Sequence, residues 1–194
     1  MGQNIKMHGG LRKGKAEYML KGKKIKLARV EKKDLKQLLN WRNNPEFRKH
    51  FREYRELNMH EQKKWYEEKV LNDPHVMMFG IRRLKDNKLL GCCGLVYVSW
   101  VYRHADLSLY IGWNDAYIDN RGYAEEGCRL LLDYGFRELS LNKIWTEIYI
   151  FDKKKKALYD KFGFHVDGVL RQNYFYEGKF WDSYILSILS TEWR

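Results

Sequence analysis

Two short runs in the second half of the chain combine residue types that could do chemistry together. The first, Asp119–Ala124, has a glycine in the turn before an amphipathic helix. Backbone N–H groups at such a helix start bind anions, because they point outward and the helix dipole favours negative charge there. The second run, Ala157–Phe164, ends a later helix and contains Tyr159, whose phenol can donate a proton. An anion cradle followed by a proton donor indicates group transfer from a phosphorylated carrier.

The glycine-bearing run resembles the pyrophosphate motif of the GNAT superfamily of acetyl-CoA-dependent N-acyltransferases. That motif reads Gln/Arg-x-x-Gly-x-Gly/Ala. Gly122 and Ala124 match it, whereas Asp119 stands where Gln or Arg is expected. The resemblance extends from about Lys24 to the C-terminus. It is greatest to the RimJ/RimL-like branch, which includes N-acetyltransferases of ribosomal proteins, spermidine and amino sugars.

The tyrosine-bearing run resembles a second motif of the same family, Asn-x-x-Ser-x-x-Leu-Tyr-x-x-x-Gly-Phe. The pairs Leu158-Tyr159 and Gly163-Phe164 match it, while Asp152 and Lys155 stand at the Asn and Ser positions. Each motif alone is a modest signal. Their order along the chain, with a strand between them, makes the resemblance specific.

The resemblance implies an α/β (α+β) architecture, the GNAT fold, in which helices flank a mixed, mostly antiparallel central sheet with one splayed strand pair. Hydrophobic periodicity alone predicts elements in the order β-α-α-β-β-β-α-β-α-β-β. The predicted strands span residues 24–30, 75–83, 89–100, 106–113, 143–149, 165–176 and 180–189. Helix starts are predicted at Asp34, at Asn58 with Glu61 as a capping box, near Ala124, and at Asp152. We expect one acetyltransferase domain, 23–194, after a flexible N-terminal extension, 1–22.

The resemblance also implies how acetyl-CoA binds. In the family, the pantetheine arm lies in the slot between the splayed fourth and fifth strands and pairs with exposed backbone like an added strand. The pyrophosphate then lies on the glycine-bearing turn, where Arg121 adds a charged fork. Lys155 either contacts a CoA phosphate or lies on a solvated helix face. The cofactor-binding residues implied in this way are Leu109, Tyr110, Ile111, Asn120, Arg121, Gly122, Tyr123, Ala124, Asp152 and Lys155.

Two residues are candidates for catalysis. In the family, the tyrosine at the position of Tyr159 protonates the departing CoA thiolate or donates a hydrogen bond to it; the alternative is that its ring only packs in the core. An alkylammonium with a pKa near 10.4 must lose a proton before it attacks. Asp106, at the start of the fourth strand, is our candidate for the base or amine-orienting group; the alternative is a surface carboxylate at a strand end.

The resemblance implies that the first helices, the loop between them and the final hairpin determine which acceptor binds. The run Trp41-Arg42-Asn43 resembles the corresponding run of amino-sugar N-acetyltransferases. Trp41 could stack on a base or sugar of the acceptor, and the guanidinium of Arg42 could form two hydrogen bonds with a phosphate. The alternatives are that Trp41 packs and Arg42 forms a salt bridge. His104 is a further, weaker candidate, in a stretch, 99–106, that resembles spermidine acetyltransferases.

We therefore predict transfer of an acetyl group to a primary amine of a small molecule, with an amino sugar or a nucleotide-linked amino sugar as the leading acceptor. The alternatives are a protein N-terminal α-amine or a polyamine. A different class, a non-catalytic acyl-CoA-binding or RNA-associated module, also stays open.

Composition narrows the partners. The formal net charge of +12 attracts polyanions, but no nucleic-acid motif accompanies the lysines, so we do not expect nucleic acid. Three cysteines without metal spacing indicate reduced thiols in a cytoplasmic protein, with no metal. No apolar run approaches the length of a membrane span. Homodimer formation is left open.

Overall fold

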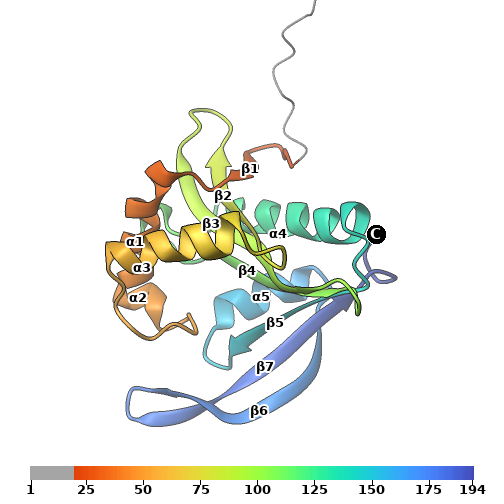
Figure 1. Cartoon of the computed structure of the whole chain (residues 1–194). Coiled ribbons are helices and arrows are strands. Elements are labelled where there is room, and N and C mark those ends of the chain that lie inside the picture. Colours follow the sequence, from red (N-terminus) through yellow and green to blue (C-terminus); the bar gives the residue numbers. More distant parts are fainter. Residues whose placement is uncertain (1–19) are drawn as a thin grey trace, which may run out of the picture.

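The computed structural model describes residues 20–194. Its centre is a seven-stranded sheet with the order β1-β2-β3-β4-β5-β7-β6 (Figure 1). Neighbouring strands run antiparallel except β4 and β5, which run parallel, so the predicted mixed, mostly antiparallel sheet is confirmed. The strands are β1 Ile25–Arg29, β2 Met77–Arg83, β3 Leu89–Ser99, β4 His104–Ile111, β5 Lys143–Tyr149, β6 His165–Tyr176 and β7 Lys179–Leu189.

Strands β4 and β5 separate along their length. They pair only over His104–Asp106 and Lys143–Trp145, although β4 continues to Ile111 and β5 continues in its pairing with β7. At the point of divergence the hydroxyl of Thr146 donates a hydrogen bond to the carbonyl oxygen of Leu107 at 3.0 Å. The splayed pair is thus confirmed, and its backbone edge beyond Asp106 faces a slot.

Helices cover both faces of the sheet (Figure 1). One face packs under α1, α2 and α3, and the other under α4 and α5, so each face has its own apolar core. Helix α3 continues as a π-helical segment, Tyr66–Leu71, and α4 does the same over Tyr134–Glu138. The helices are α1 Leu35–Asn43, α2 Pro45–Arg48, α3 Met59–Trp65, α4 Tyr123–Asp133 and α5 Lys153–Lys161.

The alternation of side chains along β4 divides the site between these two faces. Leu107, Leu109 and Ile111 point into the core beneath α4 and α5. Asp106 and Tyr110, one residue out of step with them, face the α1–α3 side, where both line a cavity.

The helix starts agree with the sequence in part. The capping box of Asn58 and Glu61 is present at the start of α3. The predicted side-chain cap of Asp34 on α1 is absent. The buried carboxylate of Asp34 instead accepts hydrogen bonds from Arg82 of β2 at 2.7 and 2.6 Å, because a buried charge needs a charged partner.

The extension predicted for residues 1–22 lies outside the described residues except for its last three. There Leu20 is buried in the core, and its carbonyl oxygen accepts a hydrogen bond from the amide of Leu27 at 2.8 Å. Among residues 20–194, the structure contains no helix with the length and apolar character needed to cross a membrane.

Candidate active site

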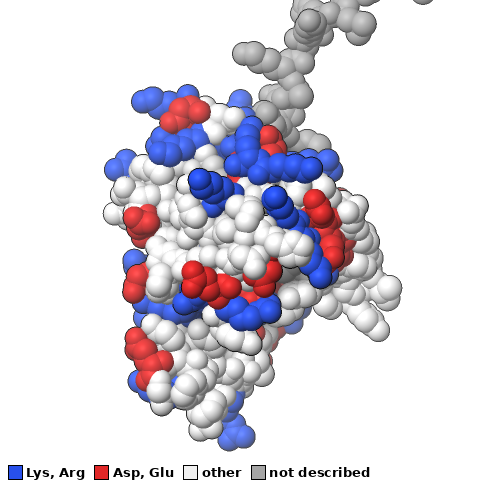
Figure 2. All heavy atoms as spheres, turned by 60° about the vertical axis from the view of Figure 1, so that its left-hand side comes forward, with Lys and Arg blue, Asp and Glu red and all other residues white. Residues whose placement is uncertain are grey.

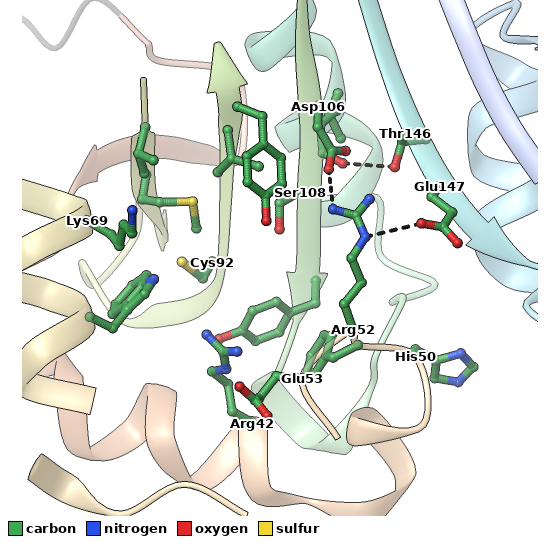
Figure 3. A pocket seen from close by; sticks show the side chains of 18 of the residues that line it. Arg42, His50, Arg52, Glu53, Lys69, Cys92, Asp106, Ser108, Thr146 and Glu147 are labelled. Carbon is green, nitrogen blue, oxygen red and sulfur yellow. Dashed lines mark hydrogen bonds and ion pairs between the residues drawn. The ribbon is translucent and has the colours of Figure 1, made fainter. Parts of the chain in front are cut away.

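A cavity of about 520 Å³ lies on the α1–α3 face, where β4 and β5 diverge. Side chains from helices, strands and the segment after α2 converge on it (Figure 3). The polar residues that line it include Arg42, Arg52, Gln62, Asp106, Glu147 and Lys155.

Asp106 is the last residue of β4 that pairs with β5, and its side chain faces this cavity with 3% of the residue's surface exposed. Its Oδ2 accepts a hydrogen bond from Nη1 of Arg52 at 2.6 Å, and Nε of Arg52 lies 3.4 Å from Oε2 of Glu147 (Figure 3). Burial raises the pKa of the Asp106 carboxyl above its ordinary value, although Arg52 acts to lower it. The surface-carboxylate alternative is therefore wrong.

Tyr159 lies in the core beneath α4 and α5 and is not among the residues that line the cavity. Its side chain is completely buried, with its ring 5.0 Å from that of Phe164. Its hydroxyl has no hydrogen-bond partner among residues 20–194. Burial raises the pKa of Tyr159 well above its usual value, and the carboxylates of Asp106 and Asp152 act in the same direction. The phenol therefore stays protonated and can donate a hydrogen bond, although its raised pKa makes it a weaker acid than an exposed tyrosine.

The predicted anion cradle, defined as the backbone amides of Arg121–Ala124, has the expected shape but holds an internal ligand. Gly122 has φ +82°, a left-handed conformation that glycine adopts without strain. The amides of Arg121, Tyr123 and Ala124 donate to the carboxylate of Asp119 at 2.7, 3.0 and 2.7 Å. The residue that departs from the family motif thus occupies the anion site by itself.

A second polar cluster lies at the start of α5. The carboxylate of Asp152 caps the helix, accepting from the amide of Lys155 at 3.0 Å, and it also accepts from the Tyr117 hydroxyl at 3.2 Å. His50 Nδ1 lies 3.2 Å from it. Burial acts to raise the pKa of Asp152, but His50 and Lys155 outweigh it and the pKa lies below its ordinary value.

Lys155 does not lie on a solvated helix face. Its side chain is buried and lines the cavity, with Nζ 5.2 Å from the centre of the Tyr117 ring. Burial lowers the pKa of Lys155, against the opposing effect of Asp152 and Asp106.

Three predicted substrate contacts need correction. Trp41 is buried and packs edge-on against Tyr110 with ring centroids 6.4 Å apart, so no ring of a substrate can stack on it. Asn43 exchanges two hydrogen bonds with the backbone of Leu57, at 2.7 and 2.9 Å, and anchors the segment before α3. His104 lies outside the cavity lining, with its ring stacked on Tyr102. Of the predicted acceptor residues, only Arg42 lines the cavity.

The remaining cofactor residues lie along the slot. The side chains of Leu109 and Ile111 are buried in the core, so only their backbone can face a cofactor. The amide of Ile111 already donates to the carbonyl oxygen of Tyr117 at 3.0 Å. Tyr110 faces the cavity. Asn120 is exposed beside the cradle.

Sequence reasoning missed Arg52, Gln62 and Glu147. Arg52 lies in an irregular segment without periodicity, so nothing in the sequence marks it as a partner of Asp106. Glu147 occupies an ordinary polar position in the alternating pattern of β5, so the pattern does not mark it as a site residue. A completely buried Gln62 is unexpected, because glutamine is usually exposed.

This geometry has counterparts among known proteins. A family model for the Acetyltransferase (GNAT) domain matches residues 24–165. The chain belongs to this family and is an N-acetyltransferase with the GNAT fold.

Individual relatives extend the comparison. The chain is 30% identical over 128 residues to the probable N-acetyltransferase YjcK of Bacillus subtilis, covering 66% of this chain and 68% of that protein. It is 25% identical over 169 residues to the spermidine N(1)-acetyltransferase of Vibrio cholerae, covering 87% and 95%. The crystal structure of spermidine N-acetyltransferase from V. cholerae with CoA and spermine superposes with a TM-score of 0.80 at 24% identity, covering 87% and 97%.

The spermidine acetyltransferases among the relatives match the polyamine alternative and not the amino sugar that we placed first. A putative ribosomal N-acetyltransferase, YdaF of B. subtilis, is 28% identical over 111 residues, covering 57% of this chain and 59% of that protein. Membership of the RimJ/RimL-like branch stays a prediction.

Proposed function

We propose that the chain transfers the acetyl group of acetyl-CoA directly to a primary amine of a small molecule, and that the amine lies against Asp106. The observation that carries this is the position of Asp106, which is buried and faces the cavity at the point where β4 and β5 diverge. An amine there lies at the bottom of the slot in which the thioester would lie.

The proton transfers follow from the groups at this point. The carboxylate of Asp106, directly or through water, takes a proton from the acceptor ammonium, and its raised pKa makes it a better base than an exposed aspartate. The free amine attacks the thioester carbonyl carbon and the C–N bond forms; the nitrogen then releases its extra proton to water as the C–S bond breaks. Tyr159, with its unpartnered hydroxyl, donates its proton to the departing thiolate and regains from water the proton that it gives up.

The cofactor would occupy the slot and the cradle. Its pyrophosphate would accept hydrogen bonds from the amides of Arg121–Ala124 once Asp119 has moved away, and Arg121 would add charge. Pantetheine would pair with backbone at Leu109 and reach Ile111 only by replacing its contact with Tyr117. Asn120, Asp152 and Lys155 remain proposed neighbours of the cofactor. Among residues 20–194 no group of His, Cys, Asp and Glu is arranged to hold a metal ion.

A polyamine is the second candidate acceptor, favoured by the names of the relatives. Four acidic residues line the cavity and would attract a cation: Glu53, Asp73, Asp106 and Glu147. As many basic residues line it: Arg42, Arg52, Lys69 and Lys155. Figure 2, which brings the α1–α3 side forward, shows basic and acidic side chains interspersed. The net charge of +12 therefore does not by itself decide between an anionic and a cationic acceptor.

An acceptor panel tests the proposal. Release of free CoA thiol from acetyl-CoA is measured with alkylamines, polyamines, N-terminal peptides and amino-sugar nucleotides, and the acetylated product is identified by mass. Turnover of small primary amines supports the proposal. Turnover of peptides alone, or binding of CoA without any transfer, contradicts it. A homodimer and a cytoplasmic location stay predictions.

A further inference from the structure

The end of the cavity between α1 and α3 contains a buried amide without partners. Gln62 of α3 is completely buried and lines the cavity. Neither its Oε1 nor its Nε2 has a hydrogen-bond partner among residues 20–194. Buried polar groups are almost always hydrogen-bonded, because desolvation without a partner is unfavourable. A molecule that fills this end of the cavity would supply the missing partners.

Arg42 of α1 lines the same cavity close to Glu53, whose pKa is lowered by Arg55 and also by Arg42, but Arg42 has no directly bonded partner among the described residues. No hydrogen bond or ion pair joins its guanidinium to another residue of the described part of the chain. The neighbouring acidic groups have other cations. Glu53 accepts two side-chain hydrogen bonds from Arg55, each 2.9 Å long, and Asp73 lies 2.9 Å from Nζ of Lys69.

At the opposite end of the cavity the charges compensate one another. Asp106 and Glu147 both pair with Arg52 there (Figure 3). The charge of Lys155 also acts on Asp106. In the same view Arg42 and Glu53 lie together, away from Asp106 and Glu147. The two ends therefore differ: the acids at the divergence of β4 and β5 are paired with a cation, whereas the guanidinium of Arg42 at α1 has no hydrogen-bonded partner among residues 20–194.

We propose that Arg42 and Gln62 bind a carboxylate at the far end of the acceptor, so that the acceptor is an amine that also carries a negative charge. The inference rests on the proposed function and deepens it. A guanidinium presents parallel N–H donors that match a carboxylate, and Nε2 of Gln62 adds a neutral donor. The free Oε1 of Gln62 would accept from an N–H or O–H of the same molecule.

A second ammonium fits this end poorly. It would meet the unpaired charge of Arg42, while both nearby carboxylates are already paired with Arg55 and Lys69. Like charges brought together in a partly desolvated cavity repel each other strongly. A diamine is therefore expected to be the poorer substrate, although relatives of this chain are named for spermidine.

Matched acceptors test the inference. γ-Aminobutyrate, putrescine and n-butylamine have similar chain lengths and differ at the far end, which carries a carboxylate, an ammonium or neither. Phosphoethanolamine adds an arm with a phosphate. In the wild-type protein, kcat/KM for γ-aminobutyrate should exceed that for n-butylamine and for putrescine by about 10-fold or more, the effect of one charge-assisted contact.

Two variants and a control assign the effect to residues. Arg42→Met keeps the aliphatic stem and should remove the preference by raising KM, and Gln62→Leu should reduce it. Lys36→Met removes one positive charge from the exposed side of the same helix and should leave the preference unchanged. A melting temperature for each variant separates loss of binding from loss of folding.

The possible outcomes separate the two claims. If putrescine is the better substrate, or if Arg42→Met retains the preference, the carboxylate site is overturned while the acetyltransferase proposal stands. A preference for phosphoethanolamine alone overturns the carboxylate assignment in favour of a phosphate. If no amine is acetylated, the proposed function fails. The carboxylate site would still be supported if γ-aminobutyrate binds to the wild-type protein in calorimetry and Arg42→Met abolishes this binding. If γ-aminobutyrate does not bind, the carboxylate site is overturned as well.

Discussion

Asp119 gives the sharpest prediction about the cofactor. Its carboxylate accepts from three of the amides that the pyrophosphate would use. Acetyl-CoA must therefore displace the Asp119 carboxylate from the cradle, and its pyrophosphate is then repelled by that carboxylate nearby. Asp119→Asn removes the charge and keeps the size and one carbonyl oxygen of the side chain, so the loop retains an acceptor.

The magnitude follows from what is exchanged. A hydrogen bond to a charged group contributes about 1.5–3 kcal/mol. The pyrophosphate recovers most of this when it accepts from the same three amides. What remains is the repulsion between two anions in a partly exposed turn, about 1–3 kcal/mol at the effective dielectric near a protein surface. The variant should therefore bind CoA about 10-fold more tightly.

Calorimetric titration with CoA measures this directly. Asp115→Asn is the matched control, because Asp115 is an exposed carboxylate in the same loop and accepts no hydrogen bond from the cradle. The gain should shrink as salt rises, since it is electrostatic. Unchanged or weaker binding by Asp119→Asn would refute the reasoning, because the carboxylate would then organise the turn and not compete for it.

Three further outcomes are expected. Tyr159→Phe should lower kcat by about 10²-fold, the scale of general-acid catalysis, with little change in acetyl-CoA affinity; near-normal turnover would mean that the ring only packs. Arg52→Gln removes the cation that lowers the pKa of Asp106, so the pKa of Asp106 should rise. Because Asp106 must be ionised to accept a proton, the acidic limb of the kcat/KM profile should then move to higher pH. An unmoved limb would exclude Asp106 as the titrating base. Trp41→Ala should cost about 3–5 kcal/mol of unfolding free energy in chemical denaturation, as expected for a buried aromatic ring, whereas a fully stable variant with a raised acceptor KM would restore the substrate-stacking role.

Sequence patterns predicted the parts of the fold that depend on local chemistry. The glycine-bearing turn before α4, the capping box of Asn58 and the cap of α5 at Asp152 each follow from residue type and spacing. The alternation along β4 predicted a strand but could not show which face Asp106 would meet. That depends on packing between distant segments.

The side chains that complete the site could not be predicted from sequence patterns, because they too depend on packing between distant segments. The pairing of Arg52 with Asp106 joins residues 54 positions apart, and no periodicity encodes it. Trp41 at the end of a helix has the same local pattern whether it packs or stacks on a substrate, and only the approach of Tyr110 decides. The mismatch at Asp119 was visible in the motif, but its occupation of the cradle was not.

The central claim is that Asp106 prepares the amine for attack on acetyl-CoA, and Asp106→Asn tests it most directly. Initial rates of CoA release with a small primary amine are measured across pH, for wild type and variant, with acetyl-CoA affinity and melting temperature as checks on the fold. We predict a loss of about 10²-fold or more in kcat/KM at neutral pH that narrows as the pH approaches the pKa of the free amine, where the acceptor deprotonates without help. Equal rates for both proteins throughout the profile would contradict the claim.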